Sequence, residues 1–208
     1  MDAVELLVPC VSPLLVRRAA RHPVSPEHPT SECFPAAVLL ADVSGFTALT
    51  ERLAQRGSAG AEELSRLLEQ LFGPLVEVVT RHGGELLHFP GDALLAVWPA
   101  RELELAEAVQ RAAQCGLSLQ RAMREPLIQR LSLSLRVAVG AGEVQELVVG
   151  GTDGRWQALV RGQPFVQLRE AERAATPGEV VLAPEARRCT EGSIEAEPLP
   201  SGAGRVKA

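Results

Sequence analysis

The sequence has no run of about 20 apolar residues, the length that a membrane-spanning helix requires. It also has no dense cluster of lysine and arginine, and its formal net charge is −5. Nucleic acid is therefore not expected as a partner. The N-terminal segment lacks the basic start of a secretion signal, and Pro9 and Pro13 interrupt its apolar patches. These absences favour a soluble protein of the cytoplasm.

Cysteine is scarce, and its four residues are spread along the chain: Cys10, Cys33, Cys115 and Cys189. None of them has the Cys-x-x-Cys or Cys/His spacing of a structural zinc site, so reduced thiols are expected. Of the 208 residues, 46% are hydrophobic and 23% are charged. That composition supports one domain with its own core and short extensions.

Proline marks the expected N-terminal boundary. Residues 1–35 contain six prolines and predict an extension or linker. We expect the main domain over residues 36–190 and a weakly structured tail over 191–208. Apolar spacing predicts strands at 36–41, 85–88, 93–98, 131–139, 144–149, 156–160 and 179–182, and helices at 46–56, 58–81, 103–123 and 165–175. This order predicts an α+β domain with a mainly antiparallel sheet and helices on one face, and Pro74 should kink or split its helix.

Two acidic residues stand where strands are expected to end. Asp42 follows an apolar run and precedes Gly45, whose freedom allows a tight turn with several N–H groups aimed at one anion. Asp92 follows Pro90-Gly91, which predicts a hairpin turn. Each aspartate alone is more often a cap or turn residue. If the two strands are neighbours, both carboxylates meet at one end and suit Mg²⁺ held jointly with phosphates.

Residues 40–51 and 84–98 together resemble the two metal-site motifs of class III nucleotidyl cyclases. The resemblance covers about residues 36–183, includes Gly162-Gln163-Pro164, and is strongest to the first catalytic half of soluble, bicarbonate-responsive adenylyl cyclase. It implies a ferredoxin-like α+β fold that works as a pair of halves. It also implies two Mg²⁺ (or Mn²⁺) ions on Asp42, Asp92 and the Val43 carbonyl. The implied reaction converts ATP to cyclic AMP and pyrophosphate, with the phosphates held by Ser44, Gly45, Phe46 and Thr47.

The chain departs from the family pattern on the segment after Gly162. Val166 and Glu170 stand where a fully active site has Asn and Arg, so the resemblance implies a complementary half that supplies this pair, or a homodimer. Ala138 and Glu143 stand where many relatives carry Lys or Arg. The alternative is therefore a degenerate, non-catalytic cyclase domain with a dimerisation or regulatory role.

Two further features bear on regulation and on a competing family. The resemblance implies a bicarbonate or regulatory site at His88, Val160 and Arg169, with His88 in place of the family's Lys. The neighbouring Gly83-Gly84-Glu85 is similar to the start of the diguanylate cyclase hairpin, but Leu86 follows where that family has a second acid. We therefore rank a diguanylate cyclase low.

Overall fold

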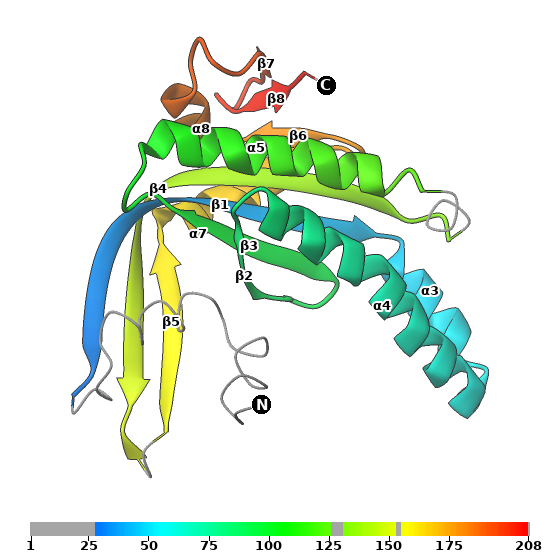
Figure 1. The fold of residues 1–208 in the computed structure, drawn as a ribbon. Coiled ribbons are helices and arrows are strands. Elements are labelled where there is room, and N and C mark those ends of the chain that lie inside the picture. The colour runs from blue at the N-terminus through cyan, green and yellow to red at the C-terminus, as the bar shows by residue number, and fades with distance from the viewer. Residues whose placement is uncertain (1–27, 126–130, 153–154, 208) are drawn as a thin grey trace.

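The structure is a computed structural model that describes residues 28–125, 131–152 and 155–207 (Figure 1). Its centre is an eight-stranded sheet in the order β2-β3-β1-β4-β6-β8-β7, with β5 paired to β4. Within these ranges only the β4–β6 pair is parallel, and the other pairings are antiparallel. The predicted α+β class with a mainly antiparallel sheet is confirmed.

The elements follow the predicted order. The strands are β1 (Thr30–Ser44), β2 (Glu85–His88), β3 (Ala93–Pro99), β4 (Ser134–Gly150), β5 (Trp156–Gly162), β6 (Val180–Leu182), β7 (Ala196–Pro198) and β8 (Gly204–Val206). The helices are α3 (Phe46–Ala54), α4 (Gly57–Arg81), α5 (Leu105–Ala122), α7 (Gln163–Ala174) and α8 (Pro184–Cys189). The two strands expected at 131–139 and 144–149 are one long strand, β4. Helix α4 continues through Pro74 and is not split.

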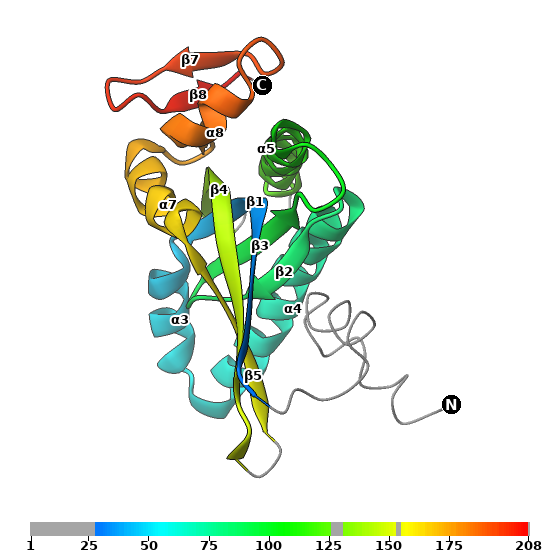
Figure 2. The same ribbon diagram turned by 90° about the vertical axis from the view of Figure 1, so that its left-hand side faces the viewer.

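Helices cover both faces of the sheet. Side chains of β1 alternate between two hydrophobic clusters, as successive strand residues must. Leu39 and Ala41 belong to the cluster beneath α4 and α5, whereas Val38 and Leu40 pack in the cluster beneath α7. Figure 2 shows α5 and α7 on opposite sides of β1 and β4. The expectation of helices on one face was therefore wrong, because a strand apolar at consecutive positions is buried on both sides.

The sheet extends beyond the expected domain at both ends. Residues 30–35, assigned to the linker, form the start of β1, which pairs with β4 from Thr30–Val148 to Ser44–Ser134. Residues 191–208 were expected to be weakly structured, yet they contain β7 and β8, and β8 pairs with β6. Strand β7 is Ala-Glu-Pro and β8 is Gly-Arg-Val, so neither has the apolar run that indicated β6. The rest of the predicted extension, residues 1–27, lies outside the described residues.

The expectations drawn from composition concerned membrane-spanning segments and the state of the cysteines. No helix within the described ranges combines the length and apolar character needed to cross a membrane. Cys33, Cys115 and Cys189 are free thiols, and Cys10 lies outside the described residues. Burial raises the pKa of Cys115 to about 12, so this thiol is protonated at neutral pH.

Candidate active site

The register of β1 and β3 brings the two predicted metal-binding residues to one end of the sheet. Asp42 is the last residue that β1 pairs with β3, and its partner is Ala93. Asp92 immediately precedes Ala93, in the turn between β2 and β3. Both aspartates are partly exposed, so a ligand can reach them. The strand neighbourhood on which the sequence prediction depended is therefore present.

The Val43 carbonyl faces the same corner. In an antiparallel ladder, the backbone groups of successive residues face alternate neighbours. The Pro35 carbonyl faces β3, because it accepts the Ala100 N–H at 2.8 Å. Val43 lies an even number of residues further along an unbroken register, so its carbonyl also faces the β3 side. It lies just past the final Asp42–Ala93 pair, beside the turn that holds Asp92.

The turn after β1 presents backbone donors. Ser44 ends β1, and Gly45 adopts φ 94° in the left-handed region, where a Cβ would lie 3.0 Å from the Ser132 carbonyl oxygen. Only glycine fits this turn without strain. Helix α3 begins at Phe46, so the N–H groups of its first turn, including Thr47, lack acceptors within the helix. A helix N-terminus with such donors suits phosphate.

Three phenylalanines connect the two metal-site loops. Phe46 opens α3 after the first motif, and Phe89 lies in the hairpin turn three residues before Asp92. Both rings pack edge-to-face against Phe72 of α4, with centroid distances of 6.5 Å and 5.0 Å. Phe72 therefore ties the loop after Asp42 to the turn that carries Asp92.

The strongest contact of Asp42 is with a residue that the sequence analysis did not include in the site. Arg136 lies directly opposite Asp42 on β4, and its Nη2 donates to Asp42 Oδ2 at 2.6 Å. The same Nη2 contacts Glu172 Oε1 of α7 at 3.0 Å. The hydrogen bond to Asp42 raises the pKa of Arg136, against desolvation, which lowers it. No spacing in the sequence signals this pair, because it depends on strand register.

The donor set fits a magnesium ion. Two carboxylates and a backbone carbonyl are hard oxygen ligands, and proteins usually bind Mg²⁺ through one or two carboxylates together with substrate phosphates. In the described part of the chain, no group of three or more His, Cys, Asp and Glu side chains is gathered for a metal ion. Asp42, Asp92 and Val43 are thus the residues that could hold such an ion, completed by phosphate oxygens.

The residues assigned to bicarbonate are only partly brought together. His88 and Val160 both line a cavity of about 510 Å³ between the β2–β3 hairpin, β5 and the start of α7. Arg169 is exposed on α7 and is not among the lining residues. Glu146, fully buried and ion-paired with Arg101 at 3.4 Å, lies in the wall of the cavity. The charge of Glu146 is compensated by Arg101, and Arg161 lines the same cavity.

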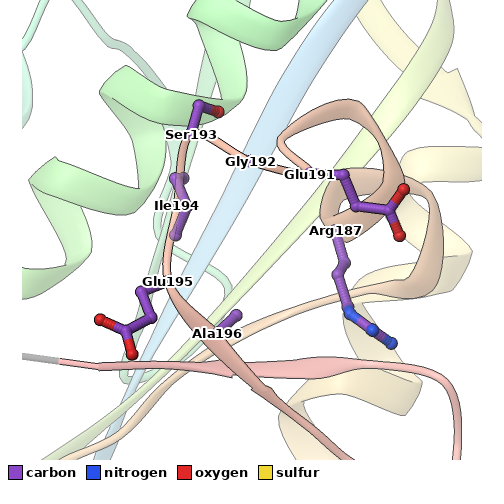
Figure 3. Close-up of a pocket in the computed structure, with 7 residues that line it drawn as sticks. All are labelled: Arg187, Glu191, Gly192, Ser193, Ile194, Glu195 and Ala196. Carbon is purple, nitrogen blue, oxygen red and sulfur yellow. The ribbon is translucent and has the colours of Figure 1, made fainter.

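A second cavity, of about 530 Å³, lies at the other end of the molecule, beside α8 and the start of β7 (Figure 3). Arg187 and Glu191 border it on one side, and Glu195 borders it on the other. Neither Asp42 nor Asp92 lines either cavity. The candidate site is thus separate from both.

The positions that depart from the family pattern are also located. Val166 and Glu170 are exposed on α7, where they are available to a partner. Ala138 is fully buried in the cluster beneath α7, and Glu143 is exposed on β4. Ala138 therefore belongs to the core and contributes nothing to a phosphate site.

Comparison with known proteins decides the family. Residues 29–200 match the family model described as adenylate and guanylate cyclase catalytic domain. The chain belongs to this cyclase family. It is 33% identical to adenylate cyclase type 10 of Rattus norvegicus over 180 residues, and 35% identical to that of Mus musculus over 181. Each match covers 85% of the chain and 11% of the relative. A match to serine/threonine-protein kinase pkn2 of Myxococcus xanthus is 32% identical and covers 80% of the chain and 18% of the relative.

Solved structures confirm the class III cyclase fold. The adenylyl cyclase CyaB from P. aeruginosa aligns with a TM-score of 0.71 at 17% identity, covering 86% of the chain and 97% of CyaB. The guanylyl cyclase Cya2 aligns with a TM-score of 0.67 at 24% identity, covering 85% and 91%. At 17% and 24% identity these similarities establish the fold and do not assign the nucleotide substrate.

Proposed function

We propose that this cyclase domain is the metal-binding half of an adenylyl cyclase, which converts ATP to cyclic AMP and pyrophosphate when paired with a complementary half. The observation that carries the proposal is the β1–β3 register, which puts Asp42 opposite the residue after Asp92. Similarity to adenylate cyclase type 10 favours ATP as the substrate. The chain spans 11% of the length of those relatives, so activity of any longer protein is itself part of the proposal.

Each residue has a defined task in this proposal. Asp42, Asp92 and the Val43 carbonyl hold two Mg²⁺ or Mn²⁺ ions, which, when bound, polarise the phosphate and favour ionisation of the attacking 3′-hydroxyl. The backbone of residues 44–47 binds the terminal phosphates. The chain thus contributes alignment and neutralisation of charge, the two effects on which phosphoryl chemistry mainly depends.

The partner is a complementary half, in the same longer chain or in another subunit, or a second copy. Among the residues that the structure describes, three large apolar side chains are exposed: Phe89 by 42%, Leu159 by 45% and Val166 by 61%. Leu159 and Val166 border the 510 Å³ cavity, and Phe89 follows His88 in the hairpin beside it. Exposed apolar side chains grouped in this way are typical of a protein–protein interface.

A second candidate function is a degenerate domain that pairs without catalysis. Val166 and Glu170 favour it, because neither side chain can stabilise a transferring phosphate as Asn and Arg do. As part of this second candidate function, we propose that His88, Val160 and Arg169 serve regulation, with bicarbonate as the ligand. In either case we propose that the protein acts in the cytoplasm.

The proposal is tested by a cyclase assay on the chain mixed with a complementary half that carries Asn and Arg. We expect Asp42→Asn and Asp92→Asn each to lower activity by roughly 100-fold or more, since each removes a charged metal ligand. Glu69→Gln, an exposed acid on α4, is the matched control and should keep full activity. Equal activity from Asp42→Asn and the parent would contradict the proposal. If the parent shows no metal-dependent binding of an ATP analogue in calorimetry, the degenerate domain is favoured instead.

A further inference from the structure

We propose that Arg136 is a displaceable counter-charge that occupies the Asp42 carboxylate until a divalent cation replaces it, and that Glu172 is a positioning residue that receives the released arginine. The inference rests on the proposed function, because it takes Asp42 to be a metal ligand. It adds that the affinity of the site for metal depends on Glu172 of α7, which is not one of the proposed metal ligands.

The geometry makes Arg136 a shared cation. A single nitrogen, Nη2, lies 2.6 Å from Asp42 Oδ2 and 3.0 Å from Glu172 Oε1. A guanidinium has five N–H donors, so these contacts use a small part of its capacity. The Nε of Arg136 is buried and has no hydrogen-bond partner among the described residues. The guanidinium is therefore held through one of its three nitrogens.

A divalent cation and Arg136 compete for the negative charge of the Asp42 carboxylate. Both are positive, and at the Asp42 oxygen they would lie within a few ångströms of each other, where repulsion is strong. In the proposed exchange, this repulsion turns Arg136 away when a cation binds. Glu172 already contacts Nη2, so the guanidinium can keep one ion pair while it gives up the other. The three side chains are 21–30% exposed, so water can take part in the exchange.

This arrangement predicts opposite effects at the two positions. Arg136→Met removes the competitor and should raise the affinity of the Asp42 site for Mn²⁺ by about twofold to fivefold, the range expected for a partly exposed ion pair. Glu172→Gln removes the alternative carboxylate, so Arg136 is left with Asp42 alone. That variant should lower Mn²⁺ affinity by about twofold to fivefold.

The experiment titrates Mn²⁺ into the full chain without nucleotide and measures free Mn²⁺ by electron paramagnetic resonance. Variants are Arg136→Met, Glu172→Gln and the double variant. Arg111→Met, an exposed ion-paired arginine on α5, is the matched control for loss of one positive charge. Because Glu172 acts through Arg136, the double variant should bind Mn²⁺ as Arg136→Met does. Asp42→Asn should abolish this binding in every background.

The outcomes separate the two proposals. If Asp42→Asn leaves Mn²⁺ binding unchanged, the metal site of the proposed function fails. If Asp42→Asn abolishes binding but Arg136→Met does not strengthen it, the site stands and the present inference is overturned. A double variant weaker than Arg136→Met would show that Glu172 acts on the metal directly, which also overturns it. Should Arg136→Met not fold, unchanged affinity in Glu172→Gln is sufficient to overturn the inference.

Discussion

Gln167 and Ala141 exchange two hydrogen bonds, as two strand residues would. The Ala141 N–H donates to Gln167 Oε1 at 3.0 Å, and Gln167 Nε2 donates to the Ala141 carbonyl at 3.1 Å. The side-chain amide thus fastens α7 to the middle of β4. The contact needs Gly140, where a Cβ would lie 2.5 Å from the Pro164 carbonyl oxygen. The same contact positions α7, and with it Glu172, over the site.

We expect Gln167→Ala to lower the free energy of unfolding by about 1–3 kcal/mol, because it leaves the buried backbone groups of Ala141 without their partner. Urea unfolding followed by circular dichroism measures the change. Gln163→Ala, at an exposed position of the same helix, should change stability by less than about 0.5 kcal/mol. Equal effects from the two variants would refute the role assigned to Gln167.

The packing of α3 against α4 depends on Gly60. A Cβ at this position would lie 1.8 Å from the Leu53 carbonyl oxygen, so Gly60→Ala forces the two helices apart. We expect Gly60→Ala to lower the free energy of unfolding by about 1–3 kcal/mol, as substitutions that overpack a core do. Gly73→Ala on the same helix meets nothing within 4 Å. Its gain in helix propensity is opposed by crowding against Pro74, so its net effect should be near zero. Thermal unfolding of both variants compares them, and similar melting temperatures would contradict this account.

Glu179 should make stability depend on pH. Burial raises the pKa of Glu179, but the Thr176 N–H at 2.9 Å and Arg205 at 2.7 Å outweigh it, so the pKa lies below its ordinary value. A lowered folded-state pKa contributes stability above the unfolded value near 4.5, and that stability is lost as the pH falls through the folded value. Glu179→Gln should therefore lower the free energy of unfolding by about 1 kcal/mol at pH 7. Urea unfolding at pH 7 and near pH 3.5 should show this difference shrinking, and a constant difference would contradict it.

Much of this architecture could be predicted from local pattern. The apolar run before Asp42 and the Pro90-Gly91 turn correctly located β1 and the β2–β3 hairpin, because both signals depend on neighbouring residues. Strand β4 was predicted as two strands, at 131–139 and 144–149, which lie on either side of Gly140 and Gly142. In the structure β4 continues across these glycines, and Gly140 is where Pro164 of α7 approaches closely.

The candidate site was only partly accessible to sequence reasoning. Asp42 and Asp92 were identified by their motifs, but Arg136 is distant in sequence and meets Asp42 only through the β1–β4 register. The side of the sheet occupied by α7 was also hidden, so Glu172 could not be associated with the site. Both failures have one physical cause: contacts between distant strands and helices depend on the packing of the whole sheet.

The phenylalanine contacts have a dynamic consequence. Phe46 and Phe89 both pack against Phe72, so the loops that flank the two acids contact the same side chain of α4. We therefore expect the motions of the two loops to be correlated, and the distance between the acids to vary less than the position of either loop. On this expectation, a constant distance between the acids depends on the Phe72 ring of α4, a helix that contributes no proposed ligand.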